Sequence, residues 1–192
     1  MKVVGFNCSP RKEGNTSHMI KEVFKVLNAE GIETEMIQVG GKDLHGCRAC
    51  GACGKNKNMR CIMDDDVLNM CIQKMVNADG IIIGSPTYFA DVTAETKALI
   101  DRSGYVTRPN GMALRRKVGA AVVPMRRAGG IHAFDTINHF FSVNEMITIG
   151  SSYWNVSTAR AEGEFEKDEE GLKTMKCLGE NMAWILKKIK ED

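Results

Sequence analysis

Short apolar runs with the length of β-strands alternate along the whole chain with segments of helical periodicity. Between the runs, apolar side chains recur at helical spacing, as Ile20, Val23 and Leu27 do, so that they share one face of a helix. The run 80–85 (GIIIGS) is apolar almost throughout, which is typical of a central parallel strand covered on both faces. The five expected strands are residues 2–6, 34–39, 80–85, 117–123 and 146–150. This alternation predicts an α/β fold, a doubly wound parallel sheet of five strands with helices on both faces.

The composition is that of an ordinary globular protein, with 43% apolar and 26% charged residues among 192. A chain of this length is expected to form one domain, here residues 1–192. The formal net charge of +2 gives no reason to expect a nucleic-acid partner, and no apolar run approaches the roughly 20 residues that span a bilayer. The first apolar patch is too short for a signal peptide. We therefore expect a cytoplasmic protein with reduced thiols and no membrane partner.

Three loops follow predicted strands and are expected to meet at the carboxyl edge of the sheet, where ligands of such folds bind. The first loop, NCSPRKEGNTS (7–17), matches neither a Rossmann nor a Walker A motif. Its polar side chains precede or begin a helix, where free backbone N–H groups favour a phosphate. These residues are Ser9, Arg11, Asn15, Thr16 and Ser17. The loop therefore predicts a phosphate site, although an ordinary capped loop has a similar composition.

The other two loops add aromatic and positively charged groups at the same edge. SPTYFADV follows the third strand and offers the rings of Tyr88 and Phe89 to a planar ligand. PMRRAGG follows the fourth strand, and it combines Arg126 and Arg127 with consecutive glycines, of which Gly129 is the first. Two adjacent aromatic residues alone more often indicate packing, and the third loop alone is also typical of a solvated turn before a helix. Together the three loops predict a site for an aromatic ligand that carries a phosphate.

The motifs SPRKEGNTS and GSPTYFADVTAETKALIDR resemble those of the flavodoxin-like NAD(P)H-dependent FMN reductases. The resemblance implies strand order 2-1-3-4-5 and FMN bound at the sheet edge. It implies that the phosphate is held by Ser9, Arg11, Asn15, Thr16 and Ser17, and that the isoalloxazine is flanked by Pro86, Thr87, Tyr88 and Phe89. Members commonly have glycine where this chain has Cys8, so we expect this side chain to point away from the phosphate or to shift the loop.

Four of the seven cysteines fall in one loop, in the pattern C-x2-C-x2-C-x7-C. Three thiolates at intervals of three residues can bind three irons of one cubane, and a more distant cysteine can complete it. Zinc fits less well, because structural zinc sites use two separated Cys-x2-Cys pairs, and a metal-free loop is the third alternative. With this cysteine run, the chain resembles the iron–sulfur flavoproteins of the same superfamily, in which a compact run of this kind binds a [4Fe–4S] cluster. The resemblance therefore implies Cys47, Cys50, Cys53 and Cys61 as ligands, in a cysteine-rich loop at 40–63.

The expected function is that of an FMN-dependent oxidoreductase that transfers electrons between a reduced donor and an acceptor, through the cluster. The donor is NAD(P)H or a low-potential carrier, and the redox partner is a small molecule or a protein. The flavin carries the chemistry, so no side chain is expected to act as a catalytic acid or base. Arg126 and Arg127 are expected to stabilise negative charge on the reduced flavin. The alternatives are a cluster-free NAD(P)H-dependent flavin or quinone reductase and a non-catalytic redox- or metal-sensing module.

Two further pairs of residues carry weaker expectations. Cys71 and Cys177 fall on apolar helix faces and are expected in the core. Tyr153 and Trp154 follow the fifth strand, where they are expected either to stack on the flavin or to pack in a dimer interface. The family resemblance implies a homodimer or tetramer.

Overall fold

The computed structural model describes residues 1–191 of the chain. Its strands are β1 (Lys2–Asn7), β2 (Glu33–Gln38), β3 (Gly80–Gly84), β4 (Val118–Met125), β5 (Ile147–Thr148) and β6 (Val156–Thr158). Its helices are α1 (Asn15–Ala29), α2 (Ala52–Asn56), α3 (Leu68–Asn77), α4 (Ala94–Thr107), α5 (Gly130–Val143), the 3-10 helix η1 (Glu164–Lys167) and α6 (Glu169–Glu191). Within this range, every helix is too short or too polar to cross a membrane.

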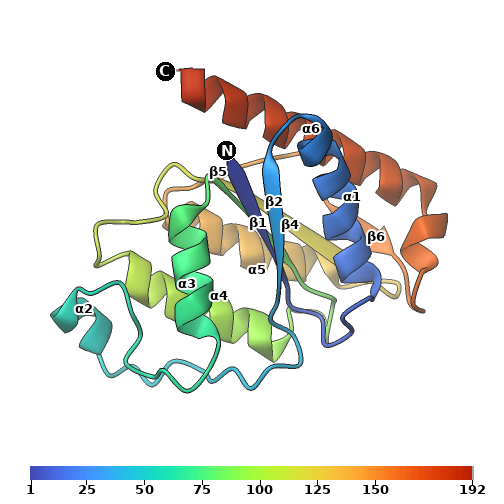
Figure 1. The fold of residues 1–192 in the computed structure, drawn as a ribbon. Coiled ribbons are helices and arrows are strands. Elements are labelled where there is room, and N and C mark those ends of the chain that lie inside the picture. The colour runs from blue at the N-terminus through green and yellow to red at the C-terminus, as the bar shows by residue number, and fades with distance from the viewer. Residues whose placement is uncertain (192) are drawn as a thin grey trace.

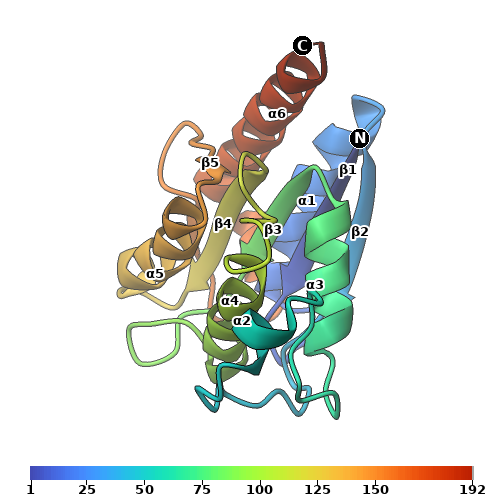
Figure 2. The same ribbon diagram turned by 90° about the vertical axis from the view of Figure 1, so that its left-hand side faces the viewer.

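The central sheet is parallel and has the strand order β2-β1-β3-β4-β5 (Figures 1 and 2). The predicted fold class and strand order are therefore confirmed. Along β1, Asn7 lies opposite Gln38 on one side and Gly84 on the other, so three strands end at the same level. The loops that follow these strands consequently begin side by side, at one edge of the sheet.

Helices cover both faces of the sheet, as the nearly continuous burial of β1, β3 and β4 requires. On β3, Ile82 packs with α1 and α6, whereas Ile81 and Ile83 pack with α3, α4 and α5. Figure 2 shows α1 and α6 on one side of the sheet and α3, α4 and α5 on the other. The two apolar layers hold the strand ends, and hence the loops, in fixed relative positions.

The predicted strand 146–150 is shorter than expected, because the chain leaves the sheet and returns further along. The Ile149 N–H still donates to the Gly119 carbonyl (3.0 Å), and β6 then resumes the pairing with Val156 opposite Val123. The intervening turn is held by the Ser151 hydroxyl, which donates to the Asn155 side chain (2.6 Å). The last strand is thus split in two, and its second half lies beside the carboxyl end of β4.

Candidate functional site

The three predicted loops meet at the carboxyl edge of the sheet and line a pocket of about 170 Å³, called here the edge pocket. They follow β1, β3 and β4, around the position where ligands of doubly wound folds lie. The lining consists of Ser9, Arg11, Gly14, Asn15, Thr16, Pro86, Thr87, Tyr88, Pro124, Met125, Arg126, Ala159 and Arg160. Ala159 and Arg160 belong to a fourth segment, which follows β6. Sequence reasoning missed this segment because the short strand β6 has no apolar run that would predict it.

The N-terminus of α1 opens onto the edge pocket without a side-chain cap. The N-cap residue is Gly14, and the first hydrogen bond of the helix runs from the His18 N–H to the Gly14 carbonyl (3.2 Å). The N–H groups of Asn15, Thr16 and Ser17 lie in the first turn, where a helix offers no acceptor. All three residues are buried. Unpaired donors at the positive end of a helix fit a phosphate group.

The side chains of the first turn have different partners. The Asn15 amide donates to the Ala161 carbonyl (2.8 Å), and the Ser17 hydroxyl donates to the Gly14 carbonyl (2.9 Å). The Thr16 hydroxyl has no hydrogen-bond partner among the described residues, and Thr16 lines the edge pocket. Thr16 is therefore the predicted side chain most available to a ligand, whereas Asn15 and Ser17 stabilise the surrounding backbone.

Buried polar side chains hold the first loop in its conformation. The Asn7 amide donates to the Lys12 carbonyl (3.3 Å) and to Gln38 (2.8 Å), and its oxygen accepts from the Ser9 N–H (3.2 Å). Gln38 in turn donates to the Ser9 carbonyl (2.7 Å). Gly40 packs so closely that a Cβ there would lie 2.2 Å from the Ser9 carbonyl carbon. Sequence reasoning missed Asn7, Gln38 and Gly40. The only signal in the sequence was that Asn7 and Gln38 are polar residues at the ends of two adjacent strands.

The second loop places part of its predicted aromatic wall at the pocket. Pro86, Thr87 and Tyr88 line it, and Thr87 is anchored by its N–H to the Pro124 carbonyl (3.1 Å). Tyr88 pairs with Asp91 through two backbone hydrogen bonds that close a tight turn. Phe89 lies at the tip of this turn with a left-handed φ of 46° and a fully exposed side chain, so it does not line the pocket.

The third loop contributes Arg126 to the lining, while Arg127 and Gly129 lie outside it. Gly129 is the N-cap of α5, with φ of 85°, and a Cβ there would lie 3.0 Å from Ala90 Cα. This glycine therefore allows the second and third loops to pack together. With Arg11 and Arg160, Arg126 gives a positive potential to a pocket that also receives the dipole of α1.

Cys8 points away from the first loop and into the core. Its thiol is 0% exposed and donates weakly to the Phe6 carbonyl (3.9 Å). Burial raises the pKa of Cys8 to about 12, and that of the core residue Cys71 likewise to about 12. Both thiols therefore remain protonated at neutral pH, and both are enclosed in the core. Cys177, expected in the core as well, is only half-buried, on α6.

The cysteine-rich loop lies at the same end of the molecule as the first loop, where β1 finishes (Figures 1 and 2). Cys47 and Cys50 are exposed, Cys53 lies on the short helix α2 and is half-buried like Cys61, and all four thiols are free. Within the described range, no three Cys, His, Asp or Glu side chains are close enough together to hold a metal ion. Two sulfurs nevertheless accept hydrogen bonds: Cys47 from the Ala49 N–H and Cys61 from Arg102, both at 3.4 Å.

A larger, mainly apolar groove of about 870 Å³ runs between α4 and α5 and borders the cysteine-rich loop at Cys53. It contains none of the residues predicted to bind FMN. The edge pocket is the better candidate site despite its smaller volume, because it combines the free helix terminus with the converging polar loops.

A doubly wound sheet of order 2-1-3-4-5 with an uncapped helix N-terminus at its carboxyl edge is typical of the class of flavodoxin-like proteins. Within this class, the profile of the NADPH-dependent FMN reductase family matches residues 1–161, and the chain belongs to this family of FMN-dependent oxidoreductases.

Two relatives match over almost their whole length. The chain is 39% identical to an iron-sulfur flavoprotein of Methanocaldococcus jannaschii, with 100% of both chains covered. It is 32% identical to an iron-sulfur flavoprotein of Methanosarcina thermophila, over 100% of this chain and 98% of the relative. Among solved structures, RosB with a bound 8-demethyl-8-formylriboflavin-5'-phosphate has a TM-score of 0.78 at 17% identity, covering 100% of this chain and 81% of RosB. A flavodoxin from the domain Archaea has a TM-score of 0.62 at 15% identity, covering 97% and 99%.

Proposed function

We propose that this oxidoreductase passes electrons from NAD(P)H or a low-potential carrier to a small-molecule or protein acceptor, through FMN and a [4Fe–4S] cluster. The observation that carries the proposal is the uncapped N-terminus of α1, which opens onto a pocket lined by three loops with polar and aromatic side chains. FMN supplies hydride and single-electron chemistry when bound. The chain itself binds, orients and electrostatically stabilises it.

In this proposal the phosphate is held by backbone N–H groups of the first turn of α1 and by the hydroxyl of Thr16. Pro86, Thr87 and Tyr88 position the ring, and Arg126 stabilises the negative charge that reduction adds. The complete set of proposed FMN-binding residues also includes predicted residues that do not line the edge pocket. It comprises Ser9, Arg11, Asn15, Thr16, Ser17, Pro86, Thr87, Tyr88, Phe89, Arg126, Arg127 and Gly129. No side chain is assigned the role of an acid or a base.

The proposed cluster ligands are Cys47, Cys50, Cys53 and Cys61. Four free thiols within one loop match the donor set of a [4Fe–4S] cluster, and N–H groups already face two of the sulfurs. The loop also contains three non-glycine residues with left-handed φ, Ala49, Lys57 and Met59. Such conformations cost free energy and persist where surrounding structure or a ligand imposes them. The names of the two relatives agree with this assignment.

A cluster-free flavin or quinone reductase is the second candidate function. It is favoured by the separation of the cysteine side chains, of which no three approach one another within the described residues. To bind a cluster, the loop has to bring its four thiols together. Cys47 and Cys50 are exposed, and the rearrangement of an exposed part of a loop has a modest entropic cost.

The assembly belongs to the same proposal. We infer one domain over residues 1–192, with the cysteine-rich loop at 40–63, in a homodimer or tetramer. Tyr153 and Trp154 support an interface, because both are exposed and their rings stack edge to face with centroids 4.9 Å apart. Trp184 on α6 is likewise 62% exposed. Large exposed aromatic side chains are enriched at interfaces.

Anaerobic purification tests the proposal directly. We expect releasable FMN in stoichiometric amounts, about four iron and four sulfide per chain as in other [4Fe–4S] proteins, and oxidation of NAD(P)H by the purified protein or reduction by a low-potential carrier. Stoichiometric FAD in place of FMN would contradict the assignment of the edge pocket to a mononucleotide. FMN without iron, with all four loop thiols reduced and metal-free, would leave the cluster-free reductase as the function.

Replacement of Thr16 by alanine tests the phosphate site. The substitution removes a hydroxyl that is free to donate to the phosphate, and a charge-assisted hydrogen bond contributes about 1.5–3 kcal/mol. We expect FMN affinity, measured by flavin fluorescence titration of the apoprotein, to fall by about tenfold or more. Thr34→Ala is the matched control, since Thr34 lies near the start of β2, at the opposite end of the strand from the edge pocket, and its hydroxyl bonds to Asn28 (3.0 Å). Equal affinities in both variants would remove Thr16 from the site.

A further inference from the structure

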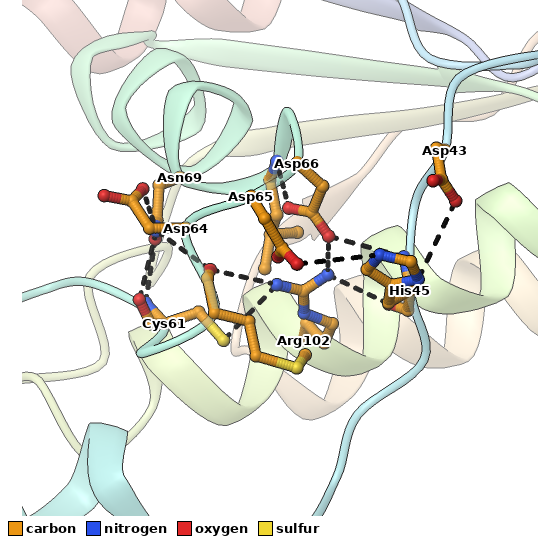
Figure 3. A network of polar contacts seen from close by, with 10 residues as sticks. Asp43, His45, Cys61, Asp64, Asp65, Asp66, Asn69 and Arg102 are labelled. Carbon is orange, nitrogen blue, oxygen red and sulfur yellow. Dashed lines mark hydrogen bonds and ion pairs between the residues drawn. The ribbon is translucent and has the colours of Figure 1, made fainter.

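Arg102, on α4, is a buried cation whose guanidinium contacts the cysteine-rich loop (Figure 3). The residue is 1% exposed. Its Nη1 donates to the His45 carbonyl (2.9 Å) and to the Asp66 carboxylate, while its Nη2 donates to Cys61 Sγ (3.4 Å) and to the Met63 carbonyl (3.3 Å). Arginine is suited to such a position because its planar fork presents parallel donors. One side chain thus ties two segments of the loop to the helix layer.

The backbone of Cys61 is held from a second helix. Its N–H donates to Asn69 Oδ1 (2.8 Å), and Asn69 Nδ2 donates back to the Cys61 carbonyl (3.0 Å). Asn69 lies on α3 and is 4% exposed. Figure 3 shows Asn69 at the backbone of Cys61 and Arg102 at its sulfur. Among the four loop cysteines, Cys61 therefore has both its backbone and its sulfur position fixed by the helices.

The ion pair between Arg102 and Asp66 has a fixed orientation relative to the Cys61 sulfur. Asp66 pairs with the Nη1 side of the guanidinium, and the sulfur faces the Nη2 side (Figure 3). The buried ion pair therefore presents its positive end to Cys61. Electrostatic interactions at a buried position are stronger than in water, so this end favours negative charge on the sulfur.

We propose that Arg102 is a positioning residue that fixes Cys61 as the preset ligand of the [4Fe–4S] cluster and raises the reduction potential of that cluster. This inference rests on the proposed function. The one-electron reduction of a cluster adds negative charge that is shared with the ligand sulfurs, and an N–H donor from a cation stabilises the reduced form more than the oxidised form. Hydrogen bonds to the sulfurs and the local charge are among the factors that set these potentials.

The test compares the wild type with the double variant Arg102→Met/Asp66→Asn, which removes the donor together with both buried charges. Removing the pair as a unit avoids an uncompensated buried charge. Arg60→Gln is the matched control, because Arg60 adjoins Cys61 and carries the same charge, but its exposed guanidinium is bonded to Asp64 (2.8 Å). Each protein is purified anaerobically and assayed for FMN and iron. The midpoint potential of the cluster is then measured at one pH by redox titration followed by electron paramagnetic resonance.

We expect the cluster potential to be more negative in the double variant and unchanged in Arg60→Gln, with FMN content equal in all three proteins. An unchanged potential in the iron-loaded double variant, or an equal decrease in Arg60→Gln, overturns the inference and leaves the proposed function intact. If the double variant keeps FMN but binds no iron, the potential of Arg102→Lys decides. An ammonium paired with Asp66 lacks the second parallel donor for the sulfur, so a decrease supports the inference and an unchanged value overturns it. A wild type without iron removes the cluster proposal itself, and this inference with it.

Discussion

At the scale of single residues, Gly40 determines how closely the chain after β2 approaches the first loop. A Cβ at this position would lie 2.2 Å from the Ser9 carbonyl carbon and 2.5 Å from that of Cys8, and backbone atoms cannot yield as a flexible side chain does. The conformation of the edge pocket thus depends on a residue that does not line it. Glycine is required at position 40 by the lack of room for a Cβ and not by backbone conformation, since its φ lies outside the left-handed region.

Gly40→Ala is expected to displace the first loop and to weaken FMN binding by at least tenfold, because the N–H groups at the start of α1 and the Ser9 side chain would no longer converge. Titration of the apoprotein with FMN, followed by flavin fluorescence, measures the change. Gly46→Ala is the matched control, since a Cβ at Gly46 meets no atom within 4 Å. An affinity that stays at the wild-type value in Gly40→Ala would show that the loop can adjust.

At the scale of elements, the ion pair between Arg102 and Asp66 joins α4 to the segment before α3. Both side chains are buried. Burial acts to raise the pKa of Asp66, but hydrogen bonds from Arg102 and from the N–H groups of Leu68 and His45 outweigh it and lower the pKa. The charged form of Asp66 is therefore favoured in the folded protein.

Asp66→Asn alone is expected to lower the free energy of unfolding by about 3–5 kcal/mol at pH 7, because it leaves the Arg102 charge buried without its partner. Since the pKa of Asp66 is lowered by folding, the charged carboxylate stabilises the protein above the unfolded pKa of about 3.9. This stabilisation is lost as the pH falls through the lower, folded pKa. Urea denaturation at pH 7 and in the acid range measures both effects. A difference between the variant and the wild type that did not shrink on acidification would contradict this account.

Periodicity predicted most elements of the fold but missed those that depend on distant partners. Local apolar patterns predict the central strand at Ile81–Ile83 and the helix at Ile20–Leu27. By contrast, β6 has the short polar sequence VST, and it is a strand only because the end of β4 offers it hydrogen-bond partners. The five-residue helix α2 likewise lies in a stretch with no apolar face, and it buries no residue.

At the scale of the whole molecule, the edge pocket and the cysteine-rich loop use different elements. The pocket is built by the loops after β1, β3 and β4 together with the segment after β6, whereas the cysteines lie between β2 and α3. The sequence predicted both regions because each has a dense local motif. It did not predict Gly14, Pro124, Met125, Ala159 and Arg160 as lining residues, because their positions follow from chain packing and not from a motif.

Cys50→Ser is expected to abolish iron binding while FMN binding stays at the wild-type level, because the two cofactors of the proposed function use separate loops. Iron and FMN contents of anaerobically purified protein provide the measurement. Cys71→Ala is the control, since Cys71 is buried in the core. The iron content of this variant should equal that of the wild type. Loss of FMN together with iron in Cys50→Ser would show that the two regions fold as one unit.

The hydrogen bonds of Asn15 join the start of α1 to the chain after β6. The amide donates to Ala161, and its oxygen accepts from the Phe165 N–H (3.2 Å), just beyond the end of the family match at residue 161. Glu164 closes the same segment by accepting from the N–H groups of Arg160 (2.6 Å) and Ala161 (2.8 Å). A ligand that binds only the folded first turn raises the free energy of local opening there. Saturation with FMN should therefore slow amide hydrogen exchange in residues 160–165, and Asn15→Ala should abolish that protection. Occupancy of the FMN site would thus control how often residues 160–165 open to solvent.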